Sequence, residues 1–211
     1  FSLLRRQNIW AVWHTKQTVI DILIFGLLGS ALCQYAYYTS IQYSNVALAT
    51  ALAYTSPAMI LLYTLVKEKR LPRLYETLCV LLVIAGSFTC ATHLNPQSLS
   101  VTPQALIWGL IGAAAFVVYT MQPHRLMQQF DLIVVIGWGM LIGGGALTGL
   151  FRPWNITILV DPILFLNMGI VIFIGTVCAF CFYQAGVGIV GSIIGSILSS
   201  VEPVASMVLS V

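Results

Sequence analysis

Two long stretches of the chain contain no charged residue, and this feature limits the fold more than any other. No Asp, Glu, Lys or Arg occurs from Ile22 to Val66 or from Pro162 to Val201. Each stretch is long enough for two membrane-spanning helices of about 20 residues joined by a tight turn. Only 7% of the 211 residues are charged, against about 25% in soluble domains. The chain therefore has too little polar surface for a soluble fold.

Hydropathy and turn signals predict seven membrane-spanning helices. Bilayer hydrocarbon accepts only helices or closed barrels, because backbone polar groups need internal partners there. These segments lack the two-residue alternation of barrel strands. The predicted spans are 19–40, 46–66, 74–92, 105–122, 132–151, 163–184 and 189–211. The expected fold class is an all-α polytopic membrane protein, and we expect this multi-pass protein in the cell (plasma) membrane.

The basic residues predict how the spans are oriented. If the helices alternate in direction, eight of the nine Lys and Arg residues fall on one side of the membrane and Arg152 alone falls on the other. The positive-inside rule makes the eight-residue side cytoplasmic. These eight residues are Arg5, Arg6, Lys16, Lys67, Lys69, Arg70, Arg73 and Arg125.

A weak internal repeat relates the two ends of the chain. At a shift of about 146 residues, a span, a short turn and a proline-bearing span recur in the same order. The aligned pairs include Gly29 with Gly175, Tyr37 with Tyr183, Leu52 with Leu198 and Pro57 with Pro203. The partner of the first span is the sixth, so the two copies run in opposite directions. Such inverted repeats are typical of secondary transporters, whose substrate site lies near the membrane midplane between the halves.

The repeat also predicts the organisation of the chain. Residues 1–92 are expected to be the C-terminal three helices of a first repeat, 93–104 the inter-repeat loop, and 105–211 the first four helices of a second repeat. On this interpretation the fold has ten helices in two inverted five-helix repeats. Its first two helices and its last are then expected to lie outside these 211 residues.

Two stretches resemble the EamA-like family of the drug/metabolite transporter superfamily. The first is ALATALAYTSPAMILLYTLVKEKRL at 47–71, followed by LLVIAGS at 81–87. The second is GSIIGSILSSVEPVASMVLS at 191–210, where small residues precede a Glu-Pro pair. The resemblance implies a ten-helix fold with a central cavity and the export or exchange of small metabolites, often amino acids.

Polar side chains within the spans are the candidates for a substrate cavity, since polar groups at membrane depth face the bundle interior or a wet space. Hydroxyls, amides and aromatic rings suit a neutral or zwitterionic solute. Each of them could instead serve interhelical hydrogen bonding. The candidates are Ser30, Gln34, Tyr38, Gln42, Thr50, Tyr54, Tyr119, Gln122, Thr176, Tyr183, Gln184, Ser196 and Glu202.

Two prolines are expected to bend their helices. Pro57 and Pro203 each lack an amide hydrogen, so the carbonyls of Ala53 and Ser199 lose a partner. Glu202, next to Pro203, lies deep in an apolar run, where a charge costs about 2.5–3.5 kcal/mol on the insertion scale. It is expected either to hydrogen-bond between helices or to face the cavity.

The sequence therefore predicts a secondary transporter that moves small amino-acid-like or drug-like metabolites, in the export direction, by alternating access. A nucleotide-sugar or phosphorylated-sugar transporter and a non-transporting membrane subunit are the alternatives. An enzyme is not expected, because the span interiors hold no pair of carboxylates and the three histidines lie in loops. Lipid and a small solute are the expected partners, with no nucleic acid, cofactor or metal; a homodimer is left open.

The orientation can be tested by cysteine labelling from outside intact cells, on a background without the native cysteines. Single cysteines in 93–104 and 152–161 should react with an impermeant reagent, and those in 67–73 and 123–130 should react only after permeabilisation. Labelling of the 67–73 loop but not of position 98 in intact cells would reverse the predicted orientation.

Overall fold

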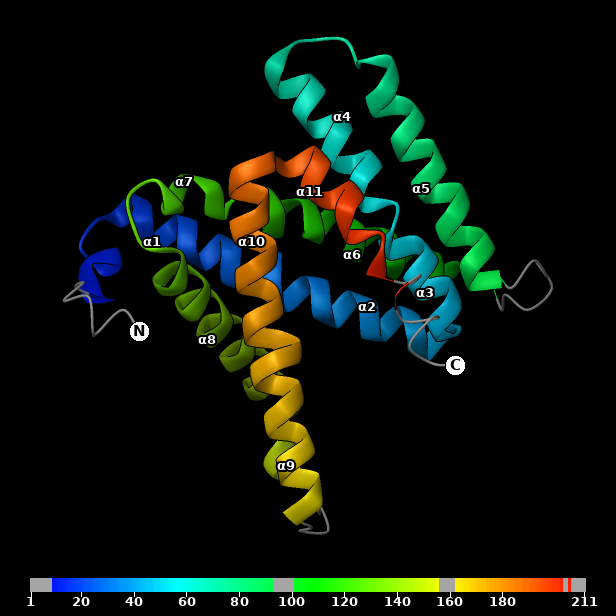
Figure 1. The fold of residues 1–211 in the computed structure, drawn as a ribbon. Coiled ribbons are helices and arrows are strands. Elements are labelled where there is room, and N and C mark those ends of the chain that lie inside the picture. Colours follow the sequence, from blue (N-terminus) through cyan, green and yellow to red (C-terminus); the bar gives the residue numbers. More distant parts are fainter. Residues whose placement is uncertain (1–8, 93–100, 156–161, 203–204, 206–211) are drawn as a thin grey trace.

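The computed structural model describes residues 9–92, 101–155, 162–202 and 205, and every regular element in these ranges is a helix (Figure 1). The expected all-α membrane protein is confirmed. Five helical stretches of the described chain are long and apolar enough to cross a membrane: Lys16–Tyr43, Val46–Glu68, Pro103–Met127, Leu132–Phe151 and Pro162–Val190. A shorter apolar stretch runs from Leu74 to Thr89.

Two groups of helices follow one another along the chain. The first consists of η1 (Ile9–Trp13), α1 (Lys16–Leu23), the π-helical η2 (Ile24–Ala31), α2 (Leu32–Tyr43), α3 (Val46–Ala53), α4 (Ser56–Glu68) and α5 (Leu74–Thr92). The second consists of α6 (Pro103–Met121), α7 (Pro123–Met127), α8 (Leu132–Phe151), η4 (Pro153–Asn155), α9 (Pro162–Ile170), the π-helical η5 (Val171–Cys178), α10 (Ala179–Val190) and α11 (Ser192–Ser199).

The span limits agree with hydropathy at most ends and differ at the sixth span. This helix continues to Val190 rather than ending at 184, because its backbone stays helical through Gly186 and Gly188 and turns only at Gly191. Gly191 has a φ of 87°, a conformation that glycine adopts without steric cost. It separates α10 from α11, so the seventh predicted span, 189–211, begins at Ser192.

Hydrogen-bonded caps fix the ends of the helices around the second span and α6. The Asn45 side chain caps α3 by accepting from the Leu48 amide at 2.9 Å. Thr102 caps α6 by accepting from the Ala105 amide at 3.2 Å, and its hydroxyl donates to the Tyr43 carbonyl at 2.8 Å. Thr102 thereby attaches the start of α6 to the end of α2.

Helix α6 lies against α2 through small residues. An added side-chain carbon at Gly112 would lie 3.4 Å from Cβ of Ala36 in α2, and one at Gly109 would collide with Leu52 in the next helix, α3. The Ser40 hydroxyl donates to the Ala105 carbonyl at 2.9 Å across the same contact. Small residues let the two backbones approach closely, as in many membrane helix pairs.

Helix α8 approaches η2 in the same way. Gly139 faces the ring of Phe25, and an added carbon at Gly143 would lie 2.8 Å from the backbone oxygen of Gly26. In contrast, the described surroundings of Gly145 and Gly149 are open. Of the two glycine pairs of α8, the Gly139–Gly143 pair therefore makes the helix contact.

The order of elements recurs along the chain. The π-helical η5 begins 147 positions after η2, and α11 begins 146 positions after α3. Both α3 and α11 have eight residues and both are followed by a two-residue turn, Tyr54–Thr55 in one case and Ser200–Val201 in the other.

Helix α9 extends away from the other helices, and the yellow to orange ribbon of α9 and α10 in Figure 1 makes this visible. None of the residues of α9 or η5 is buried. The buried part of the described chain instead centres on η2, α6 and α8, with Phe25, Tyr119 and Val135 among its core residues.

Two adjacent glycines of α8 provide a matched test of this packing. Alanine at either position raises helix propensity equally, but only Gly143→Ala forces a carbon against the Gly26 backbone; Gly144 has nothing within 4 Å. Overpacking of this kind costs about 1–3 kcal/mol, so Gly143→Ala should lower the thermal unfolding midpoint in detergent. Gly144→Ala should not lower it. Equal midpoints for the two variants would contradict the α8–η2 contact.

Candidate functional site

An aromatic cluster (Phe25, Phe116, Tyr119, Phe180 and Tyr183) lies in the bundle where η2, α6 and α10 meet. The ring of Tyr119 is its centre, with centroid distances of 5.4 to 6.2 Å to the other four rings. These are the distances at which aromatic rings attract one another. The cluster joins residues on both sides of the predicted inter-repeat loop.

Polar atoms are placed within this aromatic cluster. The Gln184 Nε2 donates to the backbone carbonyl of Tyr119 at 2.8 Å. The hydroxyls of Thr120 and Tyr183 lie 3.1 Å apart. These two hydrogen bonds fix α10 against α6, so the predicted residues Tyr119, Tyr183 and Gln184 lie together.

Two further polar atoms in the cluster are buried without a hydrogen-bond partner among the described residues. They are the Tyr119 hydroxyl and the Gln184 Oε1. Tyr119 is 4% exposed and Gln184 is fully buried. A buried polar group without a partner costs about 1–3 kcal/mol, so such groups are uncommon and point to a site that a water molecule or ligand completes.

A fourth predicted residue, Gln122, extends this site toward α1. Its Nε2 donates to Oδ1 of Asp21 at 2.9 Å, and Gln17 reaches the same oxygen at 3.5 Å. Asp21 is only 8% exposed. The predicted span 19–40 places Asp21 near its end. In the structure the helix begins earlier, at Lys16, so Asp21 lies within the helix and its carboxylate is directed into the bundle.

A cavity of about 450 Å³ adjoins the aromatic cluster, and we call it the α7–α8 cavity. It lies between the α7–α8 connection and α10, and it is open on one side. Its walls are formed by His124, Met127, Gln128, Phe130, Asp131, Leu132, Gln184, Ala185 and Gly188. Gln184 lines the cavity and also donates to the backbone carbonyl of Tyr119 in the aromatic cluster.

A second group of residues lies around the helix breaks and includes the predicted Thr50, Tyr54 and Glu202. The Tyr37 hydroxyl lies 3.2 Å from the Thr50 Oγ1, and the Tyr54 hydroxyl donates to Oε2 of Glu202 at 3.3 Å. Tyr54 follows α3 and Glu202 follows the turn after α11. The break before Pro57 therefore lies beside the break near the end of the described chain.

The other predicted site residues are not brought into either group. Ser30 lies beside Gly143 of α8, and Gln34 is half-buried. Tyr38 and Gln42 are exposed in the described structure. The Thr176 and Ser196 hydroxyls donate to carbonyls of their own helices. Pro203 lies outside the described residues.

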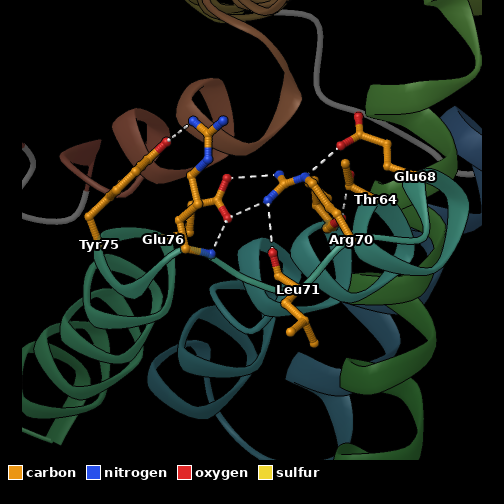
Figure 2. A network of polar contacts seen from close by, with 8 residues as sticks. Thr64, Glu68, Arg70, Leu71, Tyr75 and Glu76 are labelled. Atoms are coloured by element: carbon orange, nitrogen blue, oxygen red, sulfur yellow. Dashed lines mark hydrogen bonds and ion pairs between the residues drawn. The ribbon is translucent and has the colours of Figure 1, made fainter.

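An ion-pair network holds the connection between α4 and α5, and Figure 2 shows it. Arg70 donates to both carboxylate oxygens of Glu76 at 2.8 Å and to Glu68 at 2.6 Å. The Arg73 amide also donates to Glu76, at 2.9 Å. These carboxylates, Glu76 first, raise the pKa of the Arg70 guanidinium above its already high value.

The network also forms one wall of a second cavity, of about 440 Å³, between the α4–α5 connection and α11. Arg70 and Glu76 stand opposite apolar residues of α11 that include Ile193 and Ile197. The Arg70 guanidinium is held by the carboxylates of Glu76 and Glu68. Arg70 therefore stabilises the connection between α4 and α5.

Sequence reasoning missed the aromatic partners of Tyr119 and the role of Asp21. Phe116 and Thr120 lie one helical turn apart on α6, and Phe180 and Gln184 lie one turn apart on α10. This spacing of an aromatic and a polar residue could have indicated a shared face. The described residues contain no group of three His, Cys, Asp or Glu side chains that could hold a metal ion. The arrangement is suited to binding a solute.

Comparison with known proteins gives two findings. The chain matches the EamA-like transporter family over residues 1–92 and 103–211. It is 32% identical over 210 residues to a Salmonella typhimurium (strain LT2) protein described as an uncharacterized inner membrane transporter, YicL; the match covers all of this chain and 70% of that protein. No solved structure matches the chain.

The α4–α5 network predicts unequal effects of two isosteric substitutions. Glu76→Gln removes the negative charge and one of the two oxygens that together accept from the guanidinium and from a backbone amide, whereas Glu68→Gln changes a single contact of a side chain that is 53% exposed. Exposed ion pairs contribute little. Glu76→Gln should therefore lower the thermal unfolding midpoint more than Glu68→Gln. The reverse order would contradict the assigned geometry.

Proposed function

The chain belongs to the EamA-like transporter family, and on this basis we propose that it is part of a secondary transporter that exports small neutral or zwitterionic metabolites by alternating access. The resemblance inferred from residues 47–71 and 191–210 is confirmed by the family match. The family is one of membrane transporters and not of enzymes. The solutes are amino-acid-like or drug-like in this proposal.

The proposed fold has ten helices in two inverted five-helix repeats, of which this chain supplies seven. Residues 1–92 belong to the first repeat, 93–104 connect the repeats and 105–211 belong to the second. The recurrence of η2 and α3 as η5 and α11 supports this arrangement, and so does the separate family match over 1–92 and 103–211. The name of the Salmonella relative supports the cell membrane as the location.

The observation that carries the proposal is the contact between the two helix breaks. Tyr54 from the first group of helices donates to Glu202 from the second, 148 positions later. In secondary transporters built from repeats, broken helices meet near the midplane and move against one another. A polar contact between the two breaks is suited to forming and separating during such a movement.

The chemistry of the two groups of residues supports an uncharged or zwitterionic solute. They offer hydroxyls, amides, aromatic rings and the carboxylates of Asp21 and Glu202, and none of the described members is Lys or Arg. Phosphorylated solutes require cationic partners of this kind. Amino-acid-like solutes should therefore be carried in preference to sugar phosphates.

The proposal is tested by solute counterflow with the full-length protein in liposomes. Labelled neutral amino acids should accumulate in protein-containing vesicles preloaded with the same solute, and sugar phosphates should not. Empty vesicles are the control. Counterflow of sugar phosphates alone would replace this proposal with an anion transporter, and flux equal to that of empty vesicles would indicate a non-transporting subunit.

The role of the contact between the breaks is tested by Glu202→Gln and Tyr54→Phe. Glu202→Gln keeps size but cannot ionise, so it should flatten the dependence of transport on pH and lower the rate about tenfold or more. Tyr54→Phe removes only the hydrogen bond and should lower the rate while the pH dependence remains. Unchanged rates and pH profiles in both variants would leave Glu202 with a structural role.

A further inference from the structure

The residues that line the α7–α8 cavity favour a cationic ligand, and the family relationship does not assign this preference. Of its nine lining residues, Asp131 has the only formal charge among Asp, Glu, Lys and Arg, and His124 is the other titratable group. Met127, Phe130 and Leu132 supply an apolar surface. The cavity of about 450 Å³ has the size of a small-molecule site.

The carboxylate of Asp131 does not cap α8, the helix that Asp131 precedes. Asp131 is the residue before α8, and its backbone carbonyl accepts from the amides of Val134 and Val135 at 3.0 and 3.1 Å. Its side chain makes no capping hydrogen bond, although Asp commonly does so at this position. The carboxylate is half-buried and remains available as an acceptor in the cavity wall.

A second acceptor lies at the inner end of the cavity. Gln184 is fully buried, its Nε2 is held by the Tyr119 carbonyl, and its Oε1 has no partner among the described residues. The carbonyl that holds Nε2 belongs to Tyr119, whose ring packs among four other aromatic rings. Two residues of the cavity lining, Asp131 and Gln184, therefore carry oxygen acceptors without a hydrogen-bond partner among the described residues.

We propose that the α7–α8 cavity is an access site for solutes that carry an ammonium group, with Asp131 binding the ammonium at the open side and Gln184 Oε1 accepting from it at the inner end. The proposal rests on the proposed transport function, to which it adds a path and a head-group preference. A free carboxylate and a free amide oxygen both call for a hydrogen-bond donor, and the carboxylate favours a cationic one. The apolar residues contact the rest of the solute.

Three probes with the same apolar body separate the head groups: 2-phenylethylamine, 2-phenylethanol and 3-phenylpropionate. Their dissociation constants for the full-length protein in detergent are measured by isothermal titration calorimetry. The amine should bind at least about tenfold more tightly than the other two, as expected for a charge-assisted hydrogen bond. Equal affinities of the three probes, or tighter binding of the carboxylate, would overturn the proposal.

Variants then assign the preference to the cavity. Asp131→Asn, which keeps a residue suited to preceding a helix, should remove the preference for the amine, and Asp131→Glu should retain it. Glu68→Gln is the control, because it removes an exposed carboxylate outside the cavity and should leave all three dissociation constants unchanged. A preference that survives Asp131→Asn would overturn the proposal.

The inner acceptor is tested with Gln184→Met, which keeps the length of the side chain without the amide. Loss of one hydrogen bond corresponds to roughly a two- to tenfold weaker binding of the amine. Thermal unfolding midpoints show whether the variant is folded. Unchanged binding of the amine by folded Gln184→Met would remove Gln184 from the site.

Transport of the amine by the same proteins in liposomes separates this inference from the proposed function. Binding that depends on Asp131 without any transport would support the site and contradict the transporter. Transport that is the same in the natural protein and in Asp131→Asn would support the transporter and overturn the site.

Discussion

Every backbone N–H and C=O group within an apolar layer needs a partner, and the rest of this structure depends on that requirement. It makes each span helical, and wherever a helix breaks it requires other hydrogen-bond partners for the backbone groups at the break. After α3, the amide and hydroxyl of Thr55 both donate to the Leu52 carbonyl, at 3.0 and 2.6 Å. After α11, the amide and hydroxyl of Ser200 donate to the Ile197 carbonyl, at 3.1 and 2.6 Å. The two breaks are thus closed by the same chemistry.

These turns place polar side chains at the breaks while the amides and hydroxyls of Thr55 and Ser200 remain paired. Tyr54 and Glu202 meet because each follows a short eight-residue helix, α3 or α11, that ends in such a turn. Close helix contact then depends on small residues, as between Gly143 and the Gly26 backbone. The interior is therefore held by close packing and a few hydrogen bonds, which is the usual balance in membrane helix bundles.

The sequence was sufficient for the helices, because the absence of charge and the length of the apolar runs leave no other fold in a bilayer. It also brought Tyr119, Tyr183 and Gln184 into one candidate site, where the structure joins them. The candidates Ser30, Gln34, Tyr38 and Gln42 follow one another at steps of four residues in the first span, and such steps do not stay on one helix face. A step of four residues turns an α-helix by about 40° beyond a full turn. After three steps Gln42 therefore lies about 120° from Ser30.

Asp21 could not be placed from the sequence for a different reason. A carboxylate near a span end is ordinarily solvated, and only the position of Gln122, 101 residues later, turns it into a buried hydrogen-bond partner. The same limit applies to Phe25, whose apolar side chain cannot be distinguished in the sequence from that of an ordinary core residue. Contacts between distant helices decide these roles, and one sequence contains no signal for them.

The end of α10 is the element on which both cavities depend. Gln184, Ala185 and Gly188 line the α7–α8 cavity, and Val190 and Gly191 line the cavity beside the α4–α5 network. Gly186 and Gly188 have no side-chain neighbours within reach and lie in the last turns of the helix. Each glycine lowers helix stability by about 1 kcal/mol relative to alanine, so this segment is held by the Gln184 and Tyr183 contacts with α6. A movement of α10 that releases these contacts would open one cavity while changing the other, because Gln184, Ala185 and Gly188 line one and the adjoining Val190 and Gly191 line the other.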